Sequence, residues 1–239
     1  MFAKNQWPLA AAVVVVLAVS GCSGAGEETG GGERPGATAG SATGAESAGH
    51  VLTVAELREL AFADGEVPNA PISPVRDPVA DREKARSFPP VSDPSCQELL
   101  DLLEARDSSA SVAQIFNWEK DLWGGESLLA SYAGDGARRT FTGLRTALKT
   151  CKSYTGEGYV GEFTSEVTVQ DAPRVGDDAL SFRTASPMGD GTVMHREYVV
   201  VITGNAVAKF SKLEADRTAQ FPRTLIERQV DRLTAAQRA

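Results

Sequence analysis

Residues that could carry acid–base or nucleophilic catalysis are few in this sequence. The 239 residues include two histidines, His50 in a Gly- and Ala-rich segment and His195 at the start of an apolar run. A histidine at the start of a strand is more often a surface or hydrogen-bonded side chain than a general base. The sequence also contains no nucleophile elbow, zinc-protease motif, phosphate-binding loop or dinucleotide fingerprint. We therefore expect a protein that is not an enzyme and that needs no cofactor.

The best adjacent pair of carboxylates is Asp177-Asp178, which follows Asp171. Together these side chains could bind a cation, since carboxylate oxygens are the usual ligands of calcium. Adjacent residues on a strand point to opposite faces, however, and aspartates commonly stabilise turns through nearby backbone amides. We predict a turn here and no metal site. A hydrolase built on Asp177, Asp178 and His195 is kept as a third hypothesis.

Four aromatic residues are candidates for binding a ligand. Trp118 and Trp123 flank a polar turn, and Tyr154 and Tyr159 follow the cysteine at position 151. An aromatic ring beside a polar turn can stack on a sugar or form part of a partner surface. The alternative is that these rings pack in the core or at its rim.

A cysteine near the amino terminus indicates a different chemistry. An apolar run of about 11 residues, from Leu9 to Val19, precedes Ser20-Gly21-Cys22. The run is shorter than the roughly 20 residues that span a bilayer. The segment from Val19 to Cys22 resembles the bacterial lipobox, which implies cleavage before Cys22 and a diacylglyceryl group on that cysteine. An uncleaved membrane anchor and an ordinary secreted protein are the alternatives.

The lipobox implies that residues 1–21 are a lipoprotein signal peptide. It also implies that the mature chain is held on the outer face of the cytoplasmic membrane by the lipid on Cys22. Two acyl chains hold a protein stably, whereas one holds it only marginally. Residues 22–50 are rich in Gly, Ala, Ser, Thr and Glu and cannot bury enough apolar surface to fold. We expect a disordered tether there.

The charge balance argues against nucleic acid as a partner. The chain has 24 basic and 32 acidic residues, and residues 1–21 contain one lysine and no acid. The predicted mature chain therefore carries 23 basic residues against 32 acidic ones, a net charge of −9. Binding to phosphates needs a surplus of Lys and Arg, which this chain lacks.

Residues 51–239 are enough for one sizeable domain and hold the two remaining cysteines, Cys96 and Cys151. Two cysteines in a protein outside the cytoplasm are most simply read as one disulfide. Two buried free thiols are the alternative. A zinc site is not indicated, because the chain has no C-x-x-C pair and no neighbouring histidine pair.

Hydrophobic periodicity and turn residues predict a mixture of helices and strands in this domain. Helices are expected at 53–63, where Thr53 and Glu56 suggest a capping box, at 96–106, capped by Asp93 or Ser95, and at 135–151 and 219–236. Strands are expected at 111–118, 126–132, 163–169, 179–184, 192–203 and 206–210, with a short edge strand within 70–75. The core of 192–203 is continuously apolar, which predicts a central strand, and Gly204-Asn205 predicts a two-residue turn after it. Residues 66–94 contain seven prolines, and whether 77–92 form a lid is left open. The predicted fold is α+β: a mostly antiparallel, meandering sheet covered on one face by helices, with one disulfide.

Several motifs follow one another in an order that resembles a known family. They are a lipobox, a Gly-rich tether, and the segments 55–60, 95–100, 148–151, 176–180 and 200–208. This order is similar to that of actinobacterial lipoproteins related to the extracellular sensor domain of PknH-type Ser/Thr kinases. The resemblance implies an α+β fold with a cleft for an unidentified ligand. Kinase-linked members commonly have a second disulfide, for which this chain lacks the cysteines.

The resemblance implies a function in recognition. We expect a lipid-anchored domain outside the cytoplasm that binds a small ligand or an envelope component without catalysis. The alternative is a carrier that holds a lipid or another lipophilic molecule in an apolar cavity between the sheet and its helices.

Overall fold

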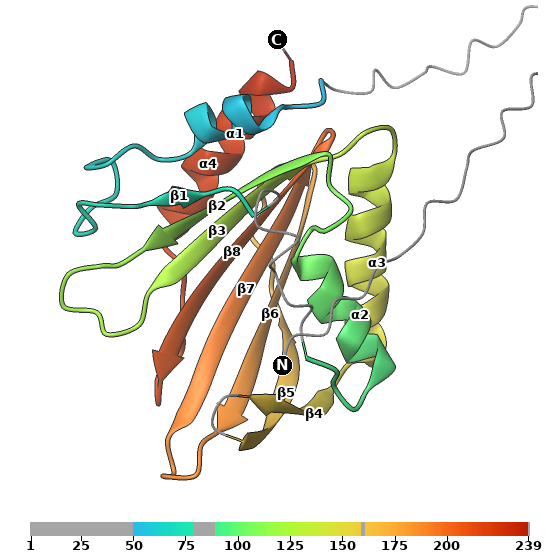
Figure 1. Ribbon diagram of the computed structural model, residues 1–239, viewed down its shortest axis with the longest axis vertical. Helices are drawn as coiled ribbons and strands as arrows, with labels where there is room; N and C mark the ends of the chain where they lie inside the picture. Colours follow the sequence, from blue (N-terminus) through green and yellow to red (C-terminus); the bar gives the residue numbers. More distant parts are fainter. Residues whose placement is uncertain (1–49, 79–88, 159–160, 239) are drawn as a thin grey trace, which may run out of the picture. The chain divides into compact units, whose positions relative to one another are not determined.

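The computed structural model describes residues 50–78, 89–158 and 161–238. The predicted signal peptide, Cys22 and most of the predicted tether lie outside these residues, as do Tyr159 and most of the segment 77–92. The described chain is built on one eight-stranded sheet in the order β1-β2-β3-β8-β7-β6-β5-β4, with every neighbouring pair antiparallel (Figure 1).

The strands and helices of the described chain have the following bounds. The strands are β1 (Val75–Arg76), β2 (Ala110–Phe116), β3 (Gly125–Ser131), β4 (Ser153–Gly158), β5 (Gly161–Gln170), β6 (Asp178–Pro187), β7 (Val193–Thr203) and β8 (Ala206–Ala215). The helices are α1 (Val54–Leu60), α2 (Pro94–Leu103), α3 (Gly136–Thr150) and α4 (Arg223–Ala236).

Two helices begin at side-chain caps that the sequence indicated. At α1, the Thr53 hydroxyl accepts a hydrogen bond from the Glu56 amide, and the Glu56 carboxylate accepts one from the Thr53 amide. The bond from the Thr53 amide, together with one that the Thr53 hydroxyl donates to the same carboxylate at 2.7 Å, favours the charged form and lowers the pKa of Glu56 to about 2. At α2, the Asp93 carboxylate accepts from the Cys96 amide at 2.9 Å, and Pro94 occupies the first helical position.

Strand β7 lies near the middle of the sheet, as its continuous apolar sequence predicted. Val199, Val200 and Val201 are each no more than 3% exposed, although successive side chains of a strand point to opposite faces. Both faces of the sheet are therefore buried here, and each needs its own cover of helices.

One face, here called the aromatic face, is covered by α1 and α4 (Figure 1). Its core contains Phe62, Phe116, Phe210 and Phe221, which pack with Leu57 of α1 and with four apolar side chains of α4. Three of these rings meet closely, with centroids 5.4 Å apart for Phe116 and Phe221 and 5.3 Å apart for Phe210 and Phe221. Aromatic side chains bury a large apolar area, and these rings pack together between the helices and the sheet.

The opposite face, here called the disulfide face, is covered by α2 and α3. Leu99, Leu100 and Leu103 of α2 pack there with Phe141 and Leu144 of α3, and both cysteines belong to the same core. The two helices also pack against each other, and the disulfide joins them.

The α+β class, the antiparallel sheet and the disulfide are confirmed, but the predicted cover on one face is wrong. Helices cover both faces because the central strands are apolar on both sides. Predicting each helix from its own residues did not show which face of the sheet it would cover. The sequence analysis also missed β4, a strand whose residues are mostly Gly, Ser and Thr and which lacks an apolar alternation.

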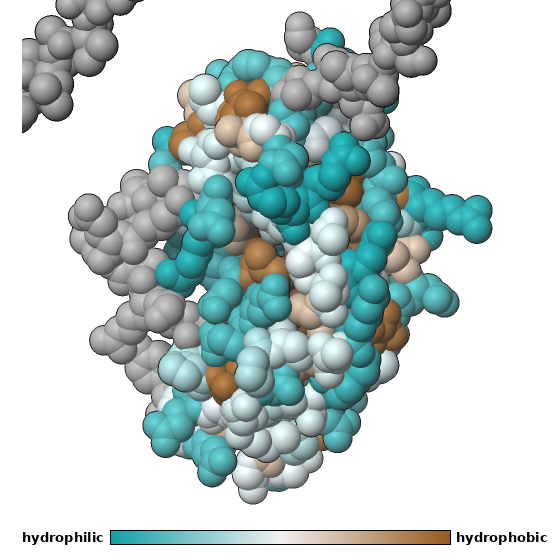
Figure 2. Space-filling view, turned by 90° about the vertical axis from the view of Figure 1, so that its right-hand side faces the viewer, coloured by the Kyte–Doolittle hydropathy of each residue, from teal (hydrophilic) through white to brown (hydrophobic). Residues whose placement is uncertain are grey.

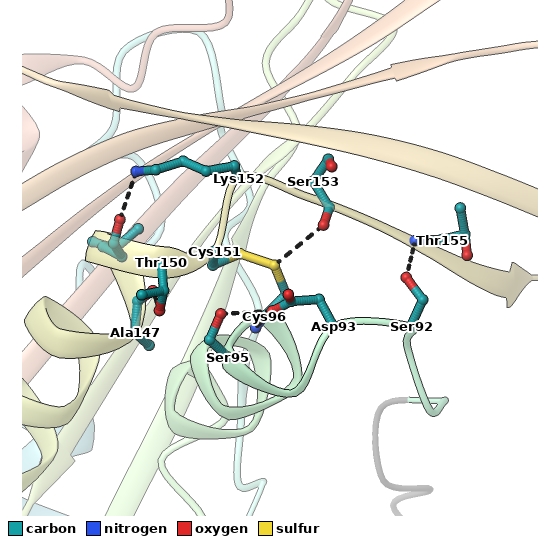
Figure 3. Close-up of a disulfide and its surroundings, with 11 residues drawn as sticks. Ser92, Asp93, Ser95, Cys96, Ala147, Thr150, Cys151, Lys152, Ser153 and Thr155 are labelled. Carbon is teal, nitrogen blue, oxygen red and sulfur yellow. Dashed lines mark hydrogen bonds between the residues drawn. A yellow bond between two sulfur atoms is a disulfide. The ribbon is translucent and has the colours of Figure 1, made fainter.

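The Cys96–Cys151 disulfide links the first turn of α2 to the residue that ends α3 (Figure 3). Both cysteines are fully buried, and their Cα atoms are 4.8 Å apart. The Lys152 ammonium donates to the Leu148 carbonyl at the same helix end. The bond closes a loop of 55 residues, for which loop entropy sets a ceiling of roughly 4 kcal/mol on the stabilisation.

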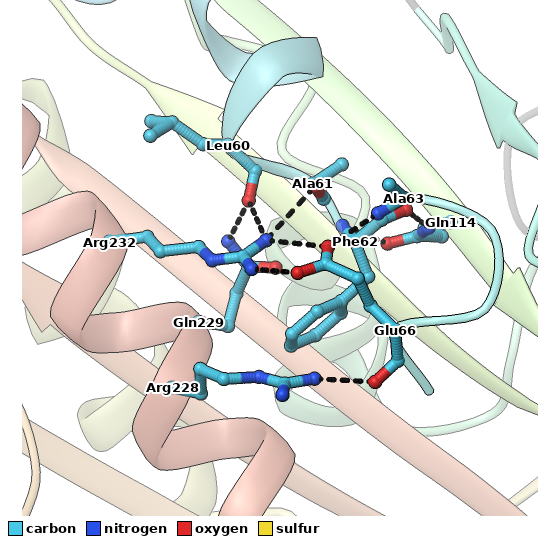
Figure 4. A network of polar contacts seen from close by, with 9 residues as sticks. All are labelled: Leu60, Ala61, Phe62, Ala63, Glu66, Gln114, Arg228, Gln229 and Arg232. Atoms are coloured by element: carbon cyan, nitrogen blue, oxygen red, sulfur yellow. Dashed lines mark hydrogen bonds and ion pairs between the residues drawn. The ribbon is translucent and has the colours of Figure 1, made fainter. Parts of the chain in front are cut away.

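A polar network ties α4 to the segment that follows α1 (Figure 4). The Arg232 guanidinium pairs with the Glu66 carboxylate at 2.5 Å and donates to the carbonyls of Leu60 and Ala61. Arg228 and Arg232 also lie over the Phe62 ring, 4.7 and 4.9 Å from its centroid. The ion pair with Arg232 lowers the pKa of Glu66.

Candidate ligand-binding cleft

The aromatic candidates named from the sequence do not form one site. Trp118 lies on the aromatic face, stacked on Phe116 with a centroid distance of 5.7 Å and edge-on to Phe221 at 5.8 Å. The Trp118 ring also lies against Gly125, where a Cβ atom would be only 2.8 Å from two ring carbons. Trp118 therefore completes the core at the end of the β2–β3 hairpin.

Trp123 lies in the same hairpin but is held through its backbone. Its amide donates to the Asp121 carboxylate at 3.1 Å, and its carbonyl accepts from the Lys212 ammonium at 2.5 Å. Lys212 also pairs with the carboxylates of Asp121 and Glu214 at 3.0 and 2.9 Å. These contacts fix the loop to β8, and the only large apolar side chain at its tip with high exposure is Leu122, at 85%.

Tyr154 lies on the other side of the sheet, and it lines a cleft there. The cleft exists because the covering helices are shorter than the strands. Ten residues of α2 extend about 15 Å, while eleven residues of β7 extend about 36 Å. Beyond Leu103, near the end of α2, the disulfide face is therefore open, and the side chains of the strands form a floor.

The cleft measures about 360 Å³, a size that fits a small molecule. Its floor crosses the sheet from β3 to β4 and its upper wall is the end of α2. The floor is formed by side chains of alternate positions on six strands, namely Glu126 of β3, Lys209 and Leu213 of β8, Met194, Arg196 and Tyr198 of β7, Thr184 and Ser186 of β6, Phe163 and Ser165 of β5, and Tyr154 of β4.

Hydroxyl groups gather at one end of this floor. The Ser165 and Ser186 hydroxyls are 2.6 Å apart on neighbouring strands, and Thr184 lies on the same face of β6. Ser165 also faces Tyr154 across β4 and β5, and the Tyr154 ring packs edge-on against Phe163 with a centroid distance of 6.2 Å. Such a surface offers hydrogen bonds together with an apolar ring face.

Both phenols of the cleft are un-ionised at neutral pH. Burial raises the pKa of Tyr154 and of Tyr198, because the charged phenolate is disfavoured away from water. The positive charge of Arg196 acts in the opposite direction on both groups. Tyr198 is stacked on Phe182 at 4.8 Å, so its ring orientation is fixed by the core.

Four charged side chains line the cleft. Lys209 and Glu126 form an ion pair at 3.1 Å, and the Lys209 side chain is only 10% exposed. Glu104 is exposed at the rim, following the end of α2. Arg196 projects from the middle of β7, between Thr184 and Leu213 on the neighbouring strands.

The carboxylate pair of the sequence analysis has a structural role. The Asp177 carboxylate accepts from the Gly204 amide at 2.7 Å, and Asp178 pairs with Arg145 of α3. The predicted turn is thus present at Gly176, whose φ is +63°. His195 lies on the aromatic-face side of β7, away from both aspartates, because it alternates with Arg196 along the strand.

The sequence analysis missed most of the cleft, and Arg196 above all. A signal existed in the alternation of β7 and β8, where Arg196 and Lys209 occupy the same face as the buried Val200 and Val207. A charged residue at an otherwise apolar period-two position marks the point where the cover of a sheet ends. The predicted lengths of helix 96–106 and strand 192–203 were close to those observed, but the sequence did not show which part of the strand the helix covers.

The surface seen from the side of α3 is mostly hydrophilic, with hydrophobic residues in small separate groups (Figure 2). In the described part of the chain, no helix is long and apolar enough to cross a bilayer. Within the same residues, no group of three or more His, Cys, Asp or Glu side chains is placed to hold a metal ion.

No family model and no curated protein matches the sequence. Among solved structures, the chain is similar to the extracellular domain of PknH from Mycobacterium tuberculosis. The identity is 13%, the match covers 80% of this chain and 99% of that one, and the TM-score is 0.56. A protein of Mycobacterium smegmatis, the Rv0999 ortholog, matches at 14% identity over 81% of this chain and 99% of that one, with a TM-score of 0.35. The PknH similarity shows a shared fold and confirms at that level the resemblance predicted from the motifs.

Proposed function

We propose that this protein is a lipid-anchored domain outside the cytoplasm that binds a small ligand in the cleft of the disulfide face, without catalysing a reaction. The observation that carries the proposal is the cleft itself, with its fixed phenols, its hydroxyls and its charged groups. A concave surface lined by a few polar groups among apolar ones is typical of ligand sites. The shared fold with a kinase extracellular domain supports the same class of function.

Binding is favoured over catalysis by the chemistry of the lining. The described lining includes hydroxyls, phenols, two cations and two carboxylates, but no histidine or cysteine. The phenols are held neutral by burial, and the serines pair with each other and not with a base. These groups can hold and orient a polar molecule, whereas activation of a hydroxyl nucleophile needs an adjacent base.

The anchor is tested separately from the cleft. Metabolic labelling with palmitate should label the full chain, and Cys22→Ser should abolish the label and release the protein from membranes. Circular dichroism of the two forms establishes that the substitution leaves the fold unchanged. Equal membrane retention of both forms would contradict the lipid anchor.

Binding is tested by native mass spectrometry and thermal shift of the full chain with fractionated cell-envelope extracts. Ser186→Trp places a large ring in the cleft, and Ala185→Trp places the same ring on the opposite face of β6. We expect a stabilising fraction for the natural chain and for Ala185→Trp, and none for Ser186→Trp. If both variants retain the shift, the ligand binds elsewhere and the proposal fails.

The carrier hypothesis is the second candidate. A carrier needs an apolar cavity that accepts an acyl chain, and the apolar cavity between α2, α3 and the sheet measures only about 10 Å³. This is about the space of one water molecule. Copurification of an acyl lipid with the full chain would support carriage over recognition of a small polar ligand.

A further inference from the structure

Three of the four charged groups of the cleft are paired or exposed, and Arg196 differs from them. Lys209 and Glu126 satisfy each other, and Glu104 is at the solvent-exposed rim. Among residues 50–78, 89–158 and 161–238, no carboxylate forms an ion pair with the Arg196 guanidinium. Its cross-strand neighbours are Thr184 and Leu213, so neither residue directly opposite Arg196 carries a negative charge.

We infer that the ligand of this cleft carries an anionic oxygen group, a carboxylate or a phosphate, that binds the guanidinium of Arg196. The inference rests on the proposed function and names the chemistry of its ligand. A guanidinium presents several donors in a planar fork, which matches two oxygens of a carboxylate or phosphate. An arginine that is partly buried and has no ion-pair partner in the described part of the chain is therefore suited to an anion supplied from outside.

The surroundings of Arg196 indicate the rest of the ligand. Ser165, Ser186 and Thr184 can exchange hydrogen bonds with hydroxyl groups, and the neutral phenols of Tyr154 and Tyr198 can donate. The Phe163 ring offers a face on which an apolar surface can stack. A cleft of about 360 Å³ accepts a molecule of monosaccharide size. The class that fits is an anionic, hydroxyl-bearing small molecule such as a sugar acid or a sugar phosphate.

The test uses three probes of one size and differing charge. Glucuronate carries a carboxylate, glucose 6-phosphate carries a phosphate, and glucose is neutral. Each is titrated into the full chain while the Arg196 Nε–H signal is followed by NMR and the affinity is measured by calorimetry. We expect saturable shifts of that signal with at least one anion and binding of glucose that is at least about 10-fold weaker. The tighter anion identifies which oxygen group the cleft prefers.

Two variants assign the effect to Arg196. Arg196→Gln should weaken the anion about 10- to 100-fold and leave glucose unchanged, whereas Arg196→Lys should keep part of the affinity because it keeps the charge. Arg183→Gln is the matched control, since it removes an arginine from the opposite face of β6. Circular dichroism and the thermal midpoint of each variant establish that it folds.

The failures of the two proposals are distinguishable. If glucose binds as tightly as the anions and Ser186→Trp blocks all three, the cleft is a ligand site but the anionic class is wrong. The inference is overturned if the anions bind Arg196→Gln as tightly as they bind the natural chain. It is also overturned if neither anion binds the natural chain at concentrations up to about 50 mM. The proposed function is then decided by the envelope-extract experiment alone.

Discussion

On the aromatic face, four phenylalanines and Trp118 fill the space beneath α1 and α4, whereas on the disulfide face α2 and α3 cover only part of the strands. Both covers pack on the same central strands, whose successive side chains point to opposite faces. On the first face, Phe221 and the β2–β3 hairpin extend the cover beyond the helices. On the second, the strands continue beyond Leu103 with polar side chains. The first face therefore holds a continuous aromatic core, whereas the second leaves the cleft in which we propose that the ligand binds.

Two lysines of β8 lie on opposite faces of the sheet and differ in the number of their partners. Lys212 points to the aromatic face and is satisfied by two carboxylates and two carbonyls. Lys209 points to the disulfide face and has a single carboxylate partner, Glu126. The first lysine is fully used in holding the hairpin, while the second lies in the floor of the cleft and is paired with Glu126 alone.

The largest effect is expected from the centre of the aromatic face. Phe221→Ala removes a ring that is 1% exposed and that contacts Phe116, Trp118 and Phe210. The lost burial and the cavity should lower the free energy of unfolding by about 3–5 kcal/mol. Urea denaturation of the full chain measures this change in the free energy of unfolding. Leu122→Ala, at the exposed tip of the hairpin, is the control and should leave the stability nearly unchanged. A loss below about 1 kcal/mol would mean that this face does not dominate stability.

The disulfide comes next. Replacing Cys96 and Cys151 together by serine should lower the free energy of unfolding by about 2–4 kcal/mol. It should also loosen α2 against α3 and so weaken binding in the cleft, whose wall includes Leu100 and Leu103. The double variant and the chemically reduced natural chain should show the same free energy of unfolding and the same ligand affinity. If stability falls but ligand affinity is unchanged, α2 is positioned by packing alone.

The third effect sharpens the contrast between the two lysines. Lys212→Met leaves the Asp121 and Glu214 carboxylates without their shared cation and should cost about 2 kcal/mol. Lys209→Met leaves only the Glu126 carboxylate without a cation, and this carboxylate already reaches solvent. The variant should therefore lower the free energy of unfolding by about 1 kcal/mol or less, while it changes the affinity for the ligand. Denaturation and calorimetry on the two variants separate these outcomes. Equal stability losses would remove the distinction between the faces.

The smallest expected effect concerns pH. The Arg232 ion pair lowers the pKa of Glu66 below its usual 4.5, so this carboxyl stabilises the folded state above about pH 4.5. The stabilisation is lost as the pH falls from 4.5 through the lower pKa that Glu66 has in the folded state. Because the pair is partly exposed, the contribution is about 1 kcal/mol at most. Glu66→Gln should flatten the dependence of the thermal midpoint on pH in this window, and an unchanged slope would contradict the assignment.

The sequence was informative where a local signal decides the structure. The cap residues Thr53 and Asp93, the turn at Gly204-Asn205 and the apolar run of β7 each predicted an element that the structure contains. The two cysteines predicted the bond that joins α2 to α3. By contrast, β4 and the second helical layer were missed, because neither is encoded in a local period.

The sequence by itself determined the α+β class, the central position of β7 and the pairing of Cys96 with Cys151, since cap residues, alternation and the number of available sulfurs are local or countable properties. Only the tertiary structure decided that helices cover both faces, that Trp118 is a core residue and that Arg196 and Lys209 share the floor of a cleft with Tyr154. The physical reason is that burial depends on how far a helix reaches over the strands beneath it. That reach is set by the packing of segments distant in the chain, which no spacing in the sequence records.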